Sequence, residues 1–428
     1  MHILVLGSGG REHALAMKLS ESALCTRLFI APGNPGTAGI GINIPMNVND
    51  FDAIRSICLQ EQVDMLVVGP EEPLVRGIYD FFQLDEALRH IHVIGPSAAG
   101  AALEGSKAFA KQFMAEMNIP TAAYREFDRS QYKEGITYLQ QHKLPVVLKA
   151  DGLAAGKGVV IAQHHEEALQ CFEDMLQNSA FGAAGDKVVV EEFLTGIECS
   201  VFVLSDGTHY TILPVAKDYK RIGEGDTGLN TGGMGAVSPV PFADEAFMMK
   251  VRERIIEPTV QGLKNRKVVY KGFIFIGLIS VDNEPYVIEY NCRMGDPETE
   301  VVMLRIENDL VDMLMSLRDE KLHSFSCIEK SQHAATVMLV SHGYPGSYEK
   351  GFPITLPALP AGSVMYHAGT TMGEGQLRTH GGRVLAVSTL APDLESALKQ
   401  SLQLAEGVQF EGKYFRRDIG WEFLPGNR

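Results

Sequence analysis

The chain has 428 residues, of which 45% are hydrophobic and 21% are charged. That length exceeds what one ordinary hydrophobic core supports, so we expect two to four subdomains. The formal net charge of -15 at pH 7 argues against non-specific binding to nucleic acid or to an anionic membrane, because both require an excess of positive charge.

The six cysteines are scattered, without a Cys-x-x-Cys pair. This distribution is typical of reduced thiols in a cytosolic protein and disfavours a disulfide or zinc framework. The chain runs from Met1 directly into an apolar segment, which leaves no room for a signal peptide. The most apolar run, residues 273–281, is too short to span a bilayer. We therefore expect a cytoplasmic protein.

The first predicted unit is a strand at residues 2–6, followed by a glycine-rich turn and a helix. This order is typical of a phosphate site, because backbone N–H groups point outward where a helix begins. A dinucleotide site is disfavoured, since Glu12 occupies the last glycine position of the fingerprint and the second strand lacks the acid that binds ribose. A sugar phosphate held by Gly9, Gly10 and Arg11 fits better.

Short apolar strands at residues 28–31, 65–68 and 92–94 continue the pattern, with a helix at 50–60. Such a repeat predicts an open parallel sheet that binds its ligand at the carboxyl ends of the strands. Asn34 and Glu71 follow two of these strands and should lie near Arg11. The alternative for both is an ordinary turn residue.

Ser106 is expected to cap a helix over residues 107–117. Lys107 begins that helix, where a cation opposes the helix dipole, so a phosphate contact would compensate it. Residues 145–150 and 158–162 then predict a hairpin around a glycine-rich tip. Lys149 and Lys157 would make this hairpin a flap over a polyphosphate, whereas the alternative is a solvated hairpin tip.

A strand at residues 187–192 leads into a connector that can offer backbone groups to an adenine edge. Phe193 and Leu194 would add apolar contact, and Glu198 would reach the ribose hydroxyls. The glycine-rich segment 226–236 is too polar to form a core element, so we interpret it as a loop shaped around a ligand. Disorder is the alternative for this loop.

Residues 287–291 predict a strand that follows a helix at 244–263 and a strand at 272–282. Side-chain period two places Glu289, Asn291 and Arg293 on one face. Hard oxygen ligands suit Mg²⁺, and a guanidinium suits a phosphoryl group. A salt-bridged strand end is the alternative.

The remaining chain predicts strands at residues 335–340, 364–367 and 382–387 and a helix at 394–405. The expected fold is therefore multidomain α/β and α+β. It comprises an N-terminal open parallel α/β sheet at 1–103, central domains at 104–328 with a flap at about 121–190, which the resemblance described next identifies as ATP-grasp domains, and a small C-terminal α+β domain at 329–428.

The central assignment depends on a family resemblance. The chain resembles the ATP-grasp ligases over essentially its whole length, and among them the phosphoribosylamine–glycine ligases. The resemblance is carried by residues 7–14, 32–34, 69–71, 103–107, 149–158, 230–236 and 291–299. Each motif alone is modest, but together, in this order and spacing, they are highly specific.

The resemblance implies ligation of glycine to 5-phosphoribosylamine, with ATP and Mg²⁺ or Mn²⁺ and no obligate protein partner. It implies catalytic roles for Arg293, Lys149 and Lys157, and metal ligation by Glu289 and Asn291. The implied ATP-binding residues are Lys107, Lys149, Gly156, Lys157, Gly158, Glu191, Glu192, Phe193, Leu194 and Glu198. The implied substrate-binding residues are Gly9, Gly10, Arg11, Asn34, Glu71, Asp218, Lys220, Asn230, Gly232, Gly233 and Asp296.

Some positions depart from the family pattern. The strand at residues 275–278 lacks the additional metal-binding acid of many ATP-grasp enzymes, so the metal would depend on Glu289, Asn291 and phosphate oxygens. Residues 217–220 and Leu229 also differ from the common residues, which leaves the roles of Lys217 and Tyr219 open.

The nearest rival function is another ATP-grasp carboxylate–amine ligase or carboxylase, acting on a related purine or biotin intermediate. A non-catalytic nucleotide-binding regulator is the more distant alternative.

Overall fold

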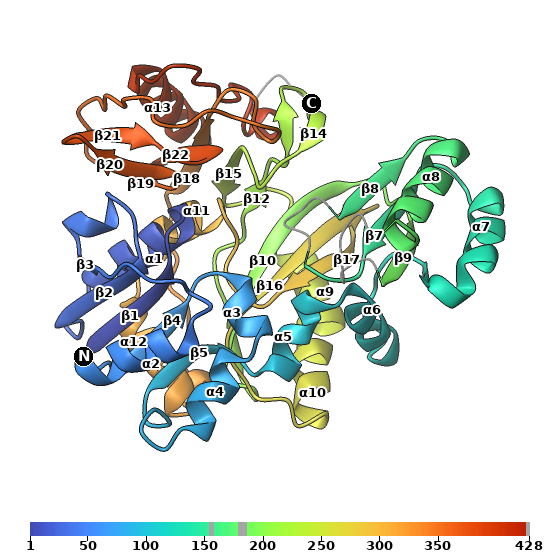
Figure 1. The fold of residues 1–428 in the computed structure, drawn as a ribbon, viewed down its shortest axis with the longest axis horizontal. Coiled ribbons are helices and arrows are strands. Elements are labelled where there is room, and N and C mark those ends of the chain that lie inside the picture. The colour runs from blue at the N-terminus through green and yellow to red at the C-terminus, as the bar shows by residue number, and fades with distance from the viewer. Residues whose placement is uncertain (154–157, 179–185, 425–428) are drawn as a thin grey trace.

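The computed structural model describes residues 1–153, 158–178 and 186–424. Its N-terminal part is an open parallel sheet, as predicted, and the strands have the order β3-β2-β1-β4-β5 (Figure 1). The strands are β1 (His2–Gly7), β2 (Arg27–Pro32), β3 (Ile42–Asn43), β4 (Met65–Val68) and β5 (His92–Pro96). The helices are α1 (Gly10–Ser20), α2 (Phe51–Gln60), α3 (Glu71–Val75), α4 (Ile78–Leu84) and α5 (Ala98–Gly105). Gly7 and Glu71 thus lie at the carboxyl ends of neighbouring strands.

This sheet does not stop at the predicted domain boundary. Strand β5 pairs antiparallel with the first residues of β16 (Tyr270–Val281), whose remaining length pairs with β10 and β17. The result is one nine-stranded sheet that includes β10 (Ile197–Ser205), β11 (Tyr210–Ile212) and β17 (Glu284–Asn291). The predicted sugar-phosphate rim and the strand carrying Glu289 therefore belong to the same hydrogen-bonded sheet.

The flap region forms a separate four-stranded sheet, at the right of Figure 1, with the order β6-β9-β7-β8. The strands are β6 (Tyr124–Asp128), β7 (Val146–Ala150), β8 (Val159–Ala162) and β9 (Lys187–Glu192), and the helices are α7 (Tyr132–Gln141) and α8 (His165–Leu176). Apolar side chains such as Phe127, Leu148 and Phe172 give it a core of its own. The predicted β7–β8 hairpin is confirmed, whereas Gly156 and Lys157 lie outside the described residues.

The helix after α5 is α6 (Lys107–Glu116), and its predicted cap is confirmed because the Ser106 hydroxyl accepts a hydrogen bond from the Phe109 N–H. The predicted helix at 244–263 is a continuous helical segment that contains a π-helical turn. It comprises α9 (Glu245–Val251), the π turn Arg252–Ile256 and α10 (Glu257–Asn265). None of the helices described here is both long and apolar enough to cross a membrane.

The C-terminal sheet has the order β12-β15-β18-β22-β19, and α13 (Leu394–Gly407) packs against β18 and β22. Its strands are β12 (Lys217–Asp218), β15 (Gly235–Ser238), β18 (His333–Val340), β19 (Ser363–His367) and β22 (Arg383–Ala391). Two small hairpins, β13 (Arg221–Gly223) with β14 (Thr227–Asn230) and β20 (Thr370–Gly373) with β21 (Gln376–Thr379), and the helices α11 (Thr299–Arg305) and α12 (Leu310–Arg318) complete the fold. Strands β12 and β15 precede residue 329, where the C-terminal domain is predicted to begin, so this sheet includes strands from both sides of that boundary. The predicted domain limits remain a proposal.

Two buried histidines join the C-terminal sheet to the N-terminal domain. The backbone N–H of His367, at the end of β19, donates to Nδ1 of His13 on α1 over 2.8 Å, and the two rings lie 5.7 Å apart. Burial lowers the pKa of His13 to about 3, aided by the nearby His367, and burial lowers the pKa of His367 to about 4. Both rings are therefore neutral in the folded protein at neutral pH.

This pair predicts a loss of stability in weak acid. The folded-state pKa values lie below the unfolded value of about 6.5, so the unfolded chain binds more protons once the pH falls below that value. We expect the free energy of unfolding to fall by up to about 1.4 kcal/mol per pH unit for each histidine between about pH 6 and pH 4. Urea unfolding of the His13→Gln variant should show a shallower pH slope than the wild type, and His380→Gln, at an exposed position, should keep the full slope. Equal slopes in all three proteins would contradict the assignment.

Candidate active site

A cleft of about 970 Å³ lies where the nine-stranded sheet, the flap and the C-terminal sheet meet. Most residues predicted for the site line it together. They are Arg11, Glu71, Lys107, Lys149, Gly158, Glu191, Glu192, Phe193, Leu194, Glu198, Asp218, Lys220, Asn230, Gly232, Glu289, Asn291, Arg293 and Asp296. Gly9, Gly10, Asn34 and Gly233 do not line it.

Strand β17 carries the two predicted metal ligands to the cleft. A β-bulge interrupts the expected alternation, because Gly277 pairs with Glu289 while the next residue pairs with Val287. The extra residue is Ile288, so the alternation from Glu289 to Asn291 is preserved. Without the bulge, the apolar positions before Glu289 would have faced the opposite side of the sheet.

The surroundings of Glu289 and Asn291 fit a hard cation. Burial favours the protonated form of Glu289, but four cations outweigh it and lower its pKa, so the carboxylate is charged. These cations are Lys220, Lys149, Arg293 and Lys107. The buried Asn291 side-chain nitrogen has no hydrogen-bond partner within the described ranges. The ionised carboxylate of Glu289 and the side-chain oxygen of Asn291, rather than its nitrogen, together form an oxygen donor set that suits Mg²⁺ or Mn²⁺.

Arg293 is held in place by two carboxylates. Its Nη2 lies 2.8 Å from Oε1 of Glu104, and its Nε lies 3.5 Å from Oε2 of Glu71. Glu104 is buried on α5 and also accepts a hydrogen bond from the Cys292 N–H over 2.8 Å. Glu104 is not among the residues predicted from the sequence, although a carboxylate in the otherwise apolar segment 98–105 is a detectable signal. The guanidinium is thus oriented before any ligand binds.

Glu191 joins two buried lysines beneath the flap. Lys149 Nζ lies 3.0 Å from Oε1 of Glu191, and Lys111 Nζ lies 3.1 Å from Oε2. Burial lowers the pKa of Lys111 to about 8, against the opposing effect of Glu191. The sequence analysis missed Lys111, whose spacing of four residues from Lys107 on one helix was the available signal. The carboxylate of Glu191 therefore positions Lys149. Because the Glu191 side chain is used in this way, only the backbone of Glu191 is available to a nucleotide.

This arrangement predicts a large stability effect for Glu191→Gln. The substitution leaves two buried ammonium groups without their counter-charge, and we expect the free energy of unfolding to fall by about 3–5 kcal/mol. Urea denaturation at pH 7 measures the change, with Glu192→Gln as the matched control because Glu192 is exposed. A Glu191→Gln protein as stable as the control would show that the ion pairs contribute no net stability.

The opposite wall of the cleft contains a charged cluster. Lys220 Nζ lies 3.1 Å from Oε2 of Glu198. Burial raises the pKa of Asp218, and burial together with the neighbouring Asp218 raises the pKa of Glu298 to about 7. The Ser200 hydroxyl donates to Glu298 over 2.9 Å. Acids that share a restricted site in this way hold fewer negative charges than their number suggests.

The C-terminal sheet contributes residues that the sequence analysis missed. Arg383, the first residue of β22, places Nη2 3.0 Å from Oδ1 of Asp296 and donates from Nη1 to the carbonyls of Asp296 and Gly232. The Gly232 N–H donates to the Tyr344 hydroxyl over 2.9 Å. The loop predicted to surround a substrate is therefore held in shape by residues more than a hundred positions away.

The N-terminal glycine turn is occupied by the protein itself. Glu12 accepts a hydrogen bond from the Gly9 N–H over 2.6 Å, and a Cβ atom at Gly7 or Gly69 would lie 2.3 or 2.2 Å from its side chain. Arg11 Nε pairs with Glu12 Oε1 over 2.6 Å, and Arg11 still lines the cleft. The glycines thus make room for Glu12, which occupies the position first assigned to a ligand.

Asn34 is likewise satisfied internally. Its side-chain nitrogen donates to the carbonyls of Ser8 and His367 over 2.9 and 2.8 Å, and its side-chain oxygen accepts from the N–H groups of Gly36 and Thr37. We therefore leave Asn34 out of the proposed site. Gly233, with φ +113°, allows close packing against Pro297. Because this packing explains the glycine, we also leave Gly233 out of the proposed site.

A flap sheet over a cleft, converging lysines and an oxygen-rich strand end together define a ligase of the ATP-grasp class. Three family models agree with this definition. They are described as the phosphoribosylglycinamide synthetase N domain (residues 1–104), ATP-grasp (A) domain (residues 105–299) and C domain (residues 334–422). The chain belongs to the phosphoribosylamine–glycine ligase family and is an ATP-dependent ligase.

Individual relatives support the same placement. The phosphoribosylamine–glycine ligase of Haemophilus influenzae is 44% identical over 428 residues, covering 98% of both chains, and that of Escherichia coli K12 is 42% identical, covering 99% of both. The crystal structure of the Thermotoga maritima phosphoribosylamine–glycine ligase is 34% identical, with a TM-score of 0.85 over 98% of this chain and all of the other. A Campylobacter jejuni biotin carboxylase shares the fold alone, at 15% identity, with a TM-score of 0.73 over 100% of this chain and 96% of the other.

Proposed function

We propose that the cleft joins glycine to 5-phosphoribosylamine in two steps, as part of purine biosynthesis. A glycine carboxylate oxygen attacks the γ-phosphorus of ATP, the bond to the β-phosphate breaks, and ADP leaves. The sugar amine then attacks the carbonyl carbon of glycyl phosphate, loses a proton, and phosphate leaves as the amide forms. The observation that carries this proposal is the convergence of Lys107, Lys149, Arg293, Glu289 and Asn291 in one cleft.

ATP would lie between the flap and the nine-stranded sheet. Lys107 and Lys149 reach this space from α6 and β7, and the connector after β9 presents its backbone groups together with Phe193 and Leu194. Glu198, the second residue of β10, lines the same cleft and would bind the ribose hydroxyls. The same proposal assigns Gly156, Lys157, Gly158, Glu191 and Glu192 to the phosphate and nucleotide contacts.

We assign Glu289 and Asn291 to a divalent cation, Mg²⁺ or Mn²⁺. A solved 2-oxoglutarate carboxylase domain from Hydrogenobacter thermophilus, 17% identical, is described in complex with MgADP. When bound, such a cation supplies positive charge next to the phosphate oxygens. Glu289 is kept ionised by four neighbouring cations, so it is ready to bind at neutral pH without losing a proton.

Arg293 would stabilise the γ-phosphoryl group as charge develops on its oxygens. Because Glu104 and Glu71 hold the guanidinium from one side, its orientation is set in advance, and no reorganisation is needed during transfer. The substrates would occupy the remaining cleft beside Arg11, Glu71, Asp218, Lys220 and Asp296. Asn230 and Gly232 would close it from the loop that Arg383 supports.

Substrate-dependent phosphate release tests this function. With ATP and Mg²⁺, we expect release to require glycine and 5-phosphoribosylamine together, and one amide to form per phosphate. The second candidate is a carboxylase, because biotin carboxylases share the fold. Release that depends strictly on bicarbonate, with no response to glycine, would replace the proposal by this alternative. We further propose a cytoplasmic location, since all six cysteines are free thiols and the proposed substrates are small molecules.

A further inference from the structure

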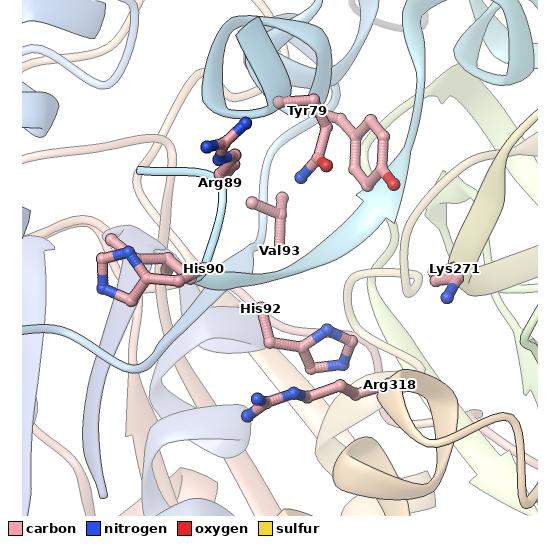
Figure 2. A pocket seen from close by; sticks show the side chains of 9 residues that line it. Tyr79, Arg89, His90, His92, Val93, Lys271 and Arg318 are labelled. Carbon is pink, nitrogen blue, oxygen red and sulfur yellow. The ribbon is translucent and has the colours of Figure 1, made fainter. Parts of the chain in front are cut away.

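A second cavity of about 150 Å³ lies apart from the cleft and shares no lining residue with it. Its walls come from α4, the turn before β5, the start of β16 and the end of α12. Figure 2 shows Arg89 and Arg318 on different sides of this cavity, with Lys271 at one end and His92 and Val93 between them. None of the lining residues is acidic.

The charge of this cavity is opposite to that of the protein as a whole. Three permanent cations, Arg89, Lys271 and Arg318, line this cavity in a chain whose net charge is -15, and two of them, Arg89 and Arg318, are exposed. Like charges that line one cavity repel each other, so an anion bound between them would be stabilised. A compensating anion is therefore expected, either from the protein or from solution.

The protein supplies this compensation from exposed acids, among them Asp319, whose charge acts on the neighbouring His92. Lys271 Nζ lies 3.5 Å from Oε1 of Glu320, whose side chain is 72% exposed, and Arg89 Nη2 lies 4.0 Å from Oε1 of Glu86, whose side chain is 89% exposed. Exposed pairs at such distances contribute little. Arg318 forms no ion pair within residues 1–153, 158–178 and 186–424.

The floor of the cavity is polar but uncharged. The buried His92 places Nε2 3.0 Å from the Leu314 carbonyl oxygen, so this nitrogen carries the hydrogen. Burial lowers the pKa of His92 to about 4, which leaves Nδ1 of the neutral ring as an acceptor. Tyr79 and Gln83 add a hydroxyl and an amide to the wall. The lining thus combines cations, neutral donors and one acceptor.

We propose that this cavity binds a small phosphate-sized oxyanion, either inorganic phosphate or the phosphate group of a small ester. Three cations match its charge, and the hydroxyl and amide groups can bind further oxygens. The volume admits a phosphate group but not a nucleotide. This site is independent of the function proposed for the cleft.

Equilibrium dialysis with radiolabelled inorganic phosphate tests the proposal. A saturating non-hydrolysable ATP analogue is present throughout, so that the nucleotide positions of the cleft are blocked. Phosphate bound in the substrate part of the cleft is the same in all variants and is subtracted as the binding that remains in the pocket variant. The pocket variant is Arg318→Gln with Lys271→Gln, and the matched control is Arg252→Gln with Lys399→Gln, which removes two exposed charges elsewhere. We expect binding to weaken about tenfold or more in the pocket variant, since a charge-assisted contact contributes that factor, and to stay unchanged in the control.

Two further arms decide the outcome. Arg89→Gln alone should also weaken phosphate binding, and competition with ribose 5-phosphate separates a free phosphate site from one for phosphate esters. Equal phosphate affinity in the pocket variant and the control would overturn the proposal, as would equal losses in both or no binding to the wild type. Circular dichroism and retained affinity for the ATP analogue confirm that each variant is folded.

Discussion

Replacing Glu289 by alanine should abolish most metal-dependent turnover while leaving the protein folded. Glu289 is the carboxylate in the proposed metal site, and its removal leaves Asn291 as the one protein ligand assigned there. We expect kcat to fall by a factor of about 10² to 10³, which corresponds to the loss of one strong interaction in the transition state. The concentration of Mg²⁺ needed for half-maximal rate should rise as well, and titration of the rate with Mg²⁺ measures both effects.

Glu284→Ala is the matched control for this experiment. Glu284 begins the same strand, but it pairs with Lys250 and Arg254 at the surface rather than facing the cleft. Its removal should change stability slightly and leave the Mg²⁺ dependence unaltered. If Glu289→Ala kept a normal Mg²⁺ titration, the metal assignment would have to be abandoned, whatever happened to kcat.

The second large effect is expected for Arg293→Lys. Lysine retains the charge but loses the planar fork that contacts Glu104 and Glu71 on one side and, in our proposal, the phosphoryl group on the other. We expect kcat to fall about 10²-fold or more, while the KM for ATP changes less than about tenfold. Steady-state kinetics with each substrate in turn measures the two constants separately.

Arg254→Lys provides the comparison, because Arg254 also pairs with a carboxylate but lies outside the cleft. It should behave like the wild type in every kinetic constant. A parallel loss of ATP affinity and kcat in Arg293→Lys would instead assign Arg293 to ground-state nucleotide binding.

The predictions that succeeded depend on local sequence. The Ser106 cap, the β7–β8 hairpin and the parallel order of the first strands follow from short-range patterns of polarity and glycine. The grouping of Glu289 with Arg293 also followed from residues close in the chain. Local rules work here because the neighbours that determine these elements are within a few residues.

The contacts that the sequence does not show depend on distant partners. The side-chain nitrogen of Asn34 donates to the carbonyls of Ser8 and His367, and the role of Asn34 in ligand binding stays a prediction. Glu104 and Arg383 were missed because their partners, Arg293 and Asp296, lie far away in the sequence. No pattern within a single segment records such pairs.

The shared nine-stranded sheet has a consequence for how the chain folds during synthesis. Strand β5 ends at Pro96, but its partner β16 begins only at Tyr270, so the ribosome adds the whole flap region before that pairing can form. Until then β5 is an open sheet edge that can pair with other nascent chains. We expect translation arrested between residues 100 and 270 to yield chains that need a chaperone, and resumed translation to release them.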